Sequence, residues 1–104
     1  MSRIDTIKGF LDDDPRDSFS RYALALEYVK LDRWDDAIQE FETIISNDAE
    51  YVATYYQLAK AYEHQEQRDK AEATYRTGMA VAIGAKDMHT VSELREAMNA
   101  LLES

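Results

Sequence analysis

The sequence contains no cysteine, one proline and three glycines in 104 residues. Without cysteine there is no disulfide framework, no thiol nucleophile and no cysteine-ligated metal. So little proline and glycine argues against a turn-rich fold, and no apolar run approaches the roughly 18 residues of a membrane-spanning helix. Hydrophobic residues make up 45% and charged residues 32% of the chain, a composition typical of packed helices. We therefore expect one all-α domain, residues 1–104, in the cytoplasm and without a membrane segment.

Positive charge is also scarce, since 12 Lys and Arg face 21 Asp and Glu and give a formal net charge of -9. Lysine and arginine neutralise phosphates when a protein binds nucleic acid or an anionic membrane. Neither kind of partner is therefore expected. The acidic excess is larger in residues 1–52, with 13 acids and 6 bases, than in residues 53–104, with 8 acids and 6 bases. A protein or peptide partner should be basic or neutral rather than acidic.

A repeat with a period of 34 residues runs through most of the chain. Residues 4–14 fit residues 38–48 at this offset, and residues 21–41 fit residues 55–75. Similarity at a fixed period indicates stacked supersecondary units, so the chain is expected to open in the second half of a repeat. The identical pairs in the second match are Tyr22 and Tyr56, Leu24 and Leu58, Ala25 and Ala59, Tyr28 and Tyr62, Asp35 and Asp69, and Ala37 and Ala71.

Apolar residues recur at helical spacing within each half of the repeat, which predicts one helix per half. Pro15 follows the first of these helices, Ser18 is expected to cap the next, and Gly84 stands where a helix end favours a left-handed residue. The predicted helices cover about residues 2–12, 18–31, 34–46, 50–65, 68–83 and 87–102.

These residues resemble the tetratricopeptide repeat, a helix-turn-helix unit of about 34 residues. The resemblance implies antiparallel helix pairs stacked as a short right-handed α-solenoid. It divides the chain into a half repeat (2–15), two repeats (18–51 and 52–85) and a capping helix (87–102). The positions that match the family's packing pattern are Leu24, Ala25, Tyr28, Ala37 and Phe41 in the first repeat, Tyr55, Leu58, Ala59, Tyr62, Ala71 and Tyr75 in the second, and Pro15 as a closing proline.

Several residues depart from the family's pattern. Arg21 replaces its first aromatic residue, and Ala49 and Ile83 replace the closing proline. Asp32 and Glu66 stand where the family usually has glycine between its two helices. Because a residue other than glycine at positive φ costs roughly 1 kcal/mol or more, we expect these two turns to differ from the family's geometry.

Nothing in the sequence indicates an enzyme. His64 and His89 have no second histidine at the spacing of a helical metal site, and residues 12–17, DDDPRD, lack the glycine and final glutamate of a calcium loop. No nucleophile has a candidate base, and there is no glycine-rich phosphate loop. We expect no catalysis, metal or cofactor.

The resemblance implies that the first helices of successive repeats line a concave face, where a peptide or protein segment would bind. The alternative for Tyr22 and Tyr56 is that they fill gaps between helices. The residues expected to point into this face are Phe19, Tyr22, Leu26, Val29 and Lys30 from the first repeat and Ala53, Tyr56, Lys60, Glu63 and His64 from the second.

One subfamily grips the terminal carboxylate of chaperone tails with Lys, Asn, Asn, Lys and Arg on that face. The corresponding positions here are Tyr22, Leu26, Gln57, Asp87 and Val91, so binding to such tails is not expected. The main function predicted is that of an adaptor or scaffold. The alternatives are a self-associating module, forming a homodimer through an end helix, and a fragment of a longer array with no groove of its own.

Overall fold

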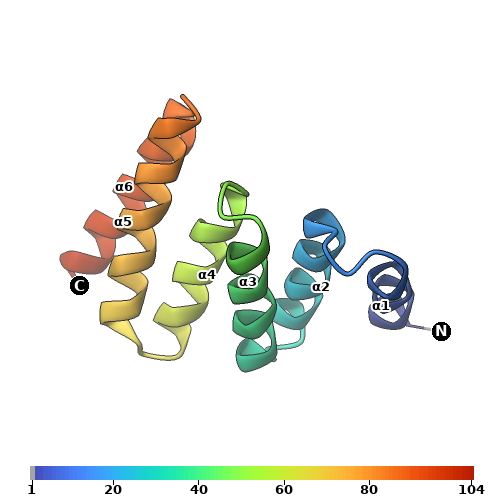
Figure 1. The fold of residues 1–104 in the computed structure, drawn as a ribbon. Helices are drawn as coiled ribbons and strands as arrows, with labels where there is room; N and C mark the ends of the chain where they lie inside the picture. Colours follow the sequence, from blue (N-terminus) through green and yellow to red (C-terminus); the bar gives the residue numbers. More distant parts are fainter. Residues whose placement is uncertain (1) are drawn as a thin grey trace.

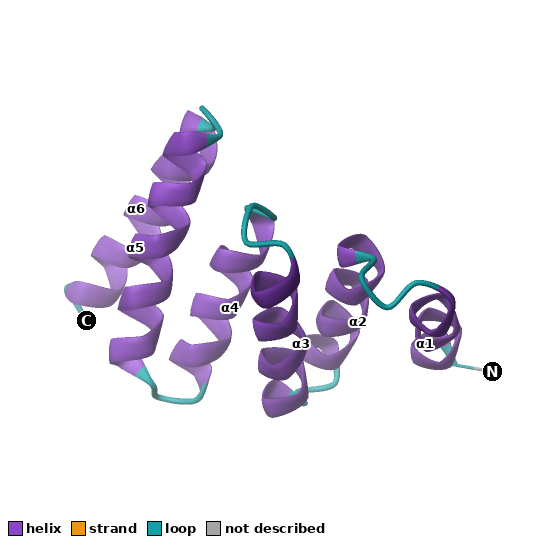
Figure 2. Cartoon of the chain, in the orientation of Figure 1, coloured by secondary structure: helices purple, strands orange, loops and turns teal. Residues whose placement is uncertain are grey.

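The computed structural model describes residues 2–104 and contains six α-helices arranged in a right-handed α-solenoid, with the two termini at opposite ends (Figure 1). Each helix packs mainly against the helices before and after it in the chain. No strand is present in residues 2–104, and short loops join the helices (Figure 2). The helices are α1 Arg3–Asp13, α2 Ser18–Lys30, α3 Trp34–Asn47, α4 Ala53–His64, α5 Arg68–Gly84 and α6 Met88–Leu102.

The predicted all-α class and the number of helices are confirmed, whereas the predicted start of the fourth helix at residue 50 is wrong. Helix α4 begins at Ala53 because residues 49–52 form a turn. The backbone N–H of Tyr51 donates to the Asp48 carbonyl at 3.0 Å, and the Tyr55 hydroxyl reaches back to donate to the carbonyl of Ala49. These two bonds stabilise the turn that brings α4 alongside α3.

The core follows the 34-residue period. Phe41 and Tyr75 occupy equivalent places in α3 and α5, and both are fully buried. Ala25, Ala59 and Ala71 are likewise inaccessible to solvent, so neighbouring helices approach closely where these small side chains lie. Every packing position carried over from the family is buried except Pro15, which is exposed in the loop between α1 and α2.

Aspartates cap the N-termini of α2 and α6. The Asp17 carboxylate accepts bonds from the Ser20 backbone N–H and hydroxyl at 3.4 and 2.6 Å, and that of Asp87 accepts the same pair from Thr90. The prediction that Ser18 caps α2 is wrong, because Ser18 is already inside the helix and its hydroxyl donates to Asp48 instead. Asp17 satisfies an otherwise unpaired N–H at the start of α2.

Stability should fall in acid partly through these two caps. The hydrogen bonds from the Ser20 and Thr90 hydroxyls lower the pKa of Asp17 and of Asp87 below the usual 3.8. A carboxylate whose pKa is lower in the folded than in the unfolded state stabilises the fold at every pH above its unfolded-state pKa. This contribution is lost as the pH falls through the folded-state pKa. Asp17→Asn with Asp87→Asn should therefore flatten the dependence of melting temperature on pH below about pH 4. An equally steep dependence in the variant would contradict this assignment.

Three helices end in a left-handed residue that is not glycine. The φ angles of Asp32, Glu66 and Lys86 are 57°, 59° and 60°. After each, the next backbone N–H bonds to a carbonyl five residues back, as from Asp87 to Ala82 at 2.9 Å, which is the Schellman motif. The expectation that Asp32 and Glu66 alter the turns is wrong, because both residues keep the left-handed conformation that glycine favours.

Gly84 does not provide the left-handed residue predicted from the sequence. It lies inside α5, no glycine among residues 2–104 has positive φ, and Lys86 takes the left-handed position two residues later. Gly84 is the last residue of α5, and Ala85 and Lys86 form the turn that reverses the chain into α6.

Lys86→Gly should raise the free energy of unfolding by about 0.5–1 kcal/mol, because it removes the strain of a Cβ atom at positive φ. Ala85→Gly is the matched control, since Ala85 has a φ of -84°. That variant should lower stability by a similar amount because glycine gains freedom in the unfolded chain. Urea unfolding of both variants tests the pair, and equal effects would contradict the turn geometry.

Candidate functional site

A hollow of about 380 Å³ lies where side chains of α2, α4 and α6 converge. We call it the tyrosine pocket. Tyr22 comes from α2, Tyr56 and Gln57 come from α4, and Asp87 and Glu93 come from the start and first half of α6. The remaining lining residues are Val52, Ala53 and Thr90. Two aromatic rings and two carboxylates thus face one space.

Aromatic packing on the side of Tyr22 away from the tyrosine pocket holds this residue in place. Its ring centre lies 6.0 Å from that of Phe41 and 5.6 Å from that of Tyr51, both in tilted contacts. Burial raises the pKa of the Tyr22 hydroxyl, while the nearby Gln57 amide acts in the opposite direction. Tyr22 is only half-buried, so it both fills the gap between helices and presents surface to the pocket. The two interpretations of this residue are compatible.

The tyrosine pocket continues along α4 and α6. Tyr56 and Glu93 also line a second hollow of about 310 Å³ with Lys60, Glu96, Ala97 and Ala100. Lys60 in turn lines a third, of about 230 Å³, with Glu63 and His64. Because neighbouring hollows share residues, they form one groove that follows α4 along its length. We call this the α4–α6 groove.

A buried tyrosine positions the charged pair in this groove. The Tyr75 hydroxyl donates to the Glu63 carboxylate from below, and both burial and this bond raise the pKa of Tyr75. Glu63 then holds Lys60, whose Nζ lies 3.8 Å from Glu63 Oε2 and 5.6 Å from the centre of the Tyr56 ring. The chain of contacts from Tyr75 to Tyr56 links the core to the groove surface.

Comparison of this chain with known proteins identifies its family. A model of the tetratricopeptide repeat matches residues 28–82, more than half of the sequence. This chain belongs to the tetratricopeptide repeat family. A tetratricopeptide repeat domain protein from Salinibacter ruber, solved by solution NMR, is 41% identical, and the match covers 85% of this chain and 89% of that one with a TM-score of 0.80. No curated protein matches the sequence.

Two more distant repeat structures share the fold. The TPR2B domain of yeast Sti1, solved in a complex with pHsp70, is 16% identical with a TM-score of 0.90, covering 96% of this chain and 80% of that one. PcrH, solved with the chaperone binding region of PopD, is 14% identical with a TM-score of 0.88, covering 96% of this chain and 76% of that one. At such low identity the likeness extends to the fold alone.

The structure brings together only some of the residues expected on the concave face of the tetratricopeptide repeats. Six of them line the α4–α6 groove: Tyr22, Ala53, Tyr56, Lys60, Glu63 and His64. Leu26 and Val29 instead pack partly against the core. Phe19, with 75% of its surface exposed, and Lys30, which pairs with Glu27 at 3.5 Å, line none of the three hollows.

His64 is an exposed residue with a structural contact. Its imidazole stacks on the indole of Trp34, with ring centres 4.0 Å apart and planes inclined by 12°. Within residues 2–104, no three His, Cys, Asp or Glu side chains are grouped to hold a metal ion. In the same range no helix has the length and hydrophobicity needed to cross a membrane.

Sequence reasoning missed the α6 side of the groove. Asp87 was named only as a position where the carboxylate clamp is absent, and Thr90 and Glu93 were assigned only to a capping helix, because at an offset of 34 the helix shows no match to the first helices of the repeats. Helix α5 is longer than α3, with 17 residues against 14. An offset of 36 would have been the signal, since it aligns the buried Val91, Leu94 and Met98 with Tyr55, Leu58 and Tyr62.

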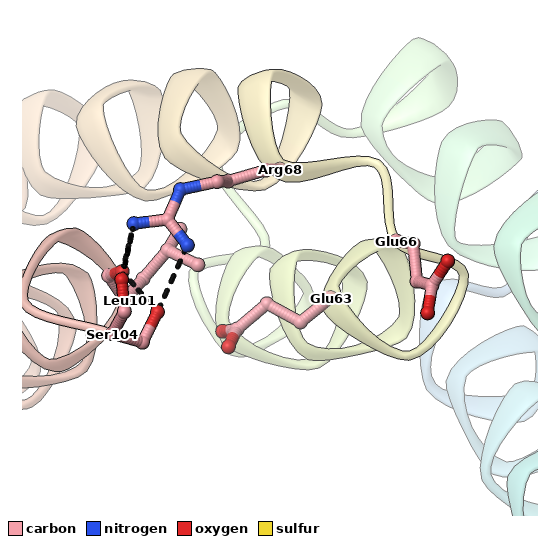
Figure 3. A pocket seen from close by; sticks show the side chains of 5 residues that line it. All are labelled: Glu63, Glu66, Arg68, Leu101 and Ser104. Carbon is pink, nitrogen blue, oxygen red and sulfur yellow. Dashed lines mark hydrogen bonds between the residues drawn. The ribbon is translucent and has the colours of Figure 1, made fainter.

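Arg68 fixes the end of α6 that forms this wall. Its guanidinium donates to the Leu101 carbonyl and, at 2.8 Å, to the Ser104 hydroxyl, while Glu63 and Glu66 line the same hollow (Figure 3). Carbonyls at a helix C-terminus lack intrahelical partners and accept such bonds readily. Arg68, at the start of α5, therefore holds the last turn of α6 beside α4.

Proposed function

We propose that this chain is a protein-interaction module that binds a peptide or protein segment in the α4–α6 groove and carries out no reaction. The observation that carries the proposal is the tyrosine pocket, where half-exposed aromatic rings from two helices meet polar groups from a third. Tyrosine provides a large contact area and loses little conformational entropy on binding. Two solved structures that share this fold are complexes: the TPR2B domain of Sti1 with pHsp70, and PcrH with the chaperone binding region of PopD.

The groove suits a segment rather than a small molecule. Its three hollows adjoin one another along α4 from Val52 to His64 and stay open to solvent along that length. An extended or helical segment can place successive side chains in successive hollows, while backbone groups bond to Gln57 and Thr90. The net charge of -9 favours a basic or neutral partner.

Selection from a display library of random twelve-residue peptides tests this proposal. The immobilised protein should enrich a family of related sequences, and a selected peptide should bind in solution and compete with the others for one site. A control protein carrying Tyr22→Ala and Tyr56→Ala should lose this enrichment. If the wild-type protein enriches nothing beyond the control, the proposed function is wrong.

Self-association is the second candidate, because three large apolar side chains are exposed on the end helices. Phe10 on α1 is 54% exposed, and Met88 and Leu102 on α6 are 58% and 44% exposed. An isologous or end-to-end contact would cover such residues. Light scattering over a concentration series distinguishes the two candidates: a constant mass of 12.0 kDa favours the module, and a mass rising with concentration favours self-association.

A further inference from the structure

We propose that the tyrosine pocket receives a basic side chain of the bound segment, arginine fitting better than lysine. This inference rests on the proposed function and specifies what the segment must carry. The pocket is lined by the carboxylates of Asp87 and Glu93 and by no lysine or arginine. Its aromatic walls are Tyr22 from α2 and Tyr56 from α4, whereas both carboxylates come from the start and first half of α6.

The Asp87 carboxylate is held in a fixed position and is charged at the N-terminus of α6. Its Oδ1 accepts the Thr90 backbone N–H at 3.2 Å, and its Oδ2 accepts the Thr90 hydroxyl at 2.6 Å. Each carboxylate oxygen can accept more than one bond, so both remain able to accept from a ligand. The Asp87 carboxylate therefore needs no reorganisation to meet a cation.

Glu93 supplies the second charge, six residues after Asp87 in the sequence. Its Oε1 lies 3.7 Å from His89 Nε2, and its side chain is 54% exposed. It can therefore turn toward a ligand while staying in water. A guanidinium has a planar fork of donors, so it can bond to a carboxylate while its flat face lies on an aromatic ring.

The neighbouring Lys60 does not line the tyrosine pocket. Lys60 lies in the adjoining hollows, where Glu63 holds its Nζ at 3.8 Å. Its Nζ lies 5.6 Å from the centre of the Tyr56 ring, within the distance at which an aromatic face attracts a cation. Tyr22 has no such neighbour among the cation–aromatic contacts of residues 2–104.

Other side chains fit the pocket less well. An acidic side chain would meet two like charges, and an apolar one would cover the carboxylates without giving them a partner, which costs desolvation energy. A basic side chain packs its aliphatic stem on Tyr22 and Tyr56 and places its charge at Asp87 and Glu93. Charge and shape thus favour the same class of residue.

The test uses a peptide selected from the random library and a copy with its arginine replaced by citrulline, a neutral side chain of similar shape. Wild-type protein should bind the citrulline copy about tenfold more weakly. Asp87→Asn with Glu93→Gln should bind the arginine peptide about tenfold more weakly and should no longer distinguish it from the citrulline copy. Asparagine is a good N-cap, so α6 should remain folded.

Asp12→Asn with Asp13→Asn is the matched control, since it removes the same charge from exposed positions on α1. This control should bind the arginine peptide as the wild type does. If selected peptides lack basic residues, or if the control loses as much affinity as the pocket variant, the inference is wrong while the proposed function stands. If the library yields no binding peptide at all, both are wrong.

Discussion

Gly78→Ala is expected to lower the free energy of unfolding by about 1–2 kcal/mol, although alanine is the better helix former. A Cβ atom at position 78 would lie 2.6 Å from the Cβ of Tyr55 and 3.1 Å from Cδ1 of Leu94. The Tyr55 Cβ is attached to the backbone of α4 and cannot rotate away. Helix α4 or α5 would have to move, and the overpacking outweighs the gain of roughly 1 kcal/mol in helix propensity.

Gly9→Ala provides the matched control. Gly9 also lies inside a helix, α1, but nothing lies within 4 Å of an added Cβ. This variant should gain about 0.5–1 kcal/mol from propensity alone. Denaturant unfolding of the two variants should therefore show shifts of opposite sign. A gain at both positions would mean that α4, α5 and α6 are not packed as closely as the structure has them.

Gly78 also bears on the groove, because it contacts both of the helices that form its walls. Tyr55 belongs to α4 and Leu94 to α6, and both are buried beneath the surface that carries Tyr56 and Glu93. A larger residue at position 78 would push α5 away from one or both of these helices. The lack of a side chain at Gly78 thus lets α5 approach both walls of the α4–α6 groove closely.

Tyr22→Ala with Tyr56→Ala should weaken binding of a selected peptide about a hundredfold, since truncating an aromatic anchor in a binding pocket commonly costs about 2 kcal/mol or more. Both tyrosines are half-buried walls of the tyrosine pocket. The variant should keep nearly all of its helical content, because the buried packing residues of both repeats are unchanged. Isothermal calorimetry gives the affinity, and circular dichroism gives the helical content.

Phe10→Ala is the control for loss of an exposed aromatic ring. Phe10 is 54% exposed on α1 and lines none of the three hollows of the groove. The Phe10→Ala variant should bind the peptide with the affinity of the wild type. Equal binding by the tyrosine variant and the wild type would mean that Tyr22 and Tyr56 act only in packing.

The period of 34 residues and the helical spacing of apolar residues were sufficient to predict six helices, because an apolar pattern fixes which faces must be buried. Features that depend on how helices meet were harder to predict. The role of Gly78 arises from contacts with Tyr55 and Leu94, which lie 23 and 16 positions away in the sequence. The left-handed residue at 86 rather than 84 depends on where α5 reverses into α6.

The candidate site was predicted only in part, again because some of its features depend on how the helices meet. Tyr22 and Tyr56 stand at equivalent places in the repeat, so their shared face could be anticipated. Asp87 was placed on this face only as a clamp position that lacks lysine, and Glu93 was not placed there, because the greater length of α5 shifts α6 out of the 34-residue register. Only the packing of α6 beside α4 shows that these acids face the tyrosines.

The most direct test of binding in the α4–α6 groove is an NMR titration of 15N-labelled protein with a selected peptide. The largest amide shift changes should cluster on the groove, at Tyr22, Gln57 and Thr90. Exposed residues on the outer faces of α3 and α5, such as Gln39 and Thr77, should change little. Largest changes at those outer residues, or along α1, would contradict binding in the α4–α6 groove.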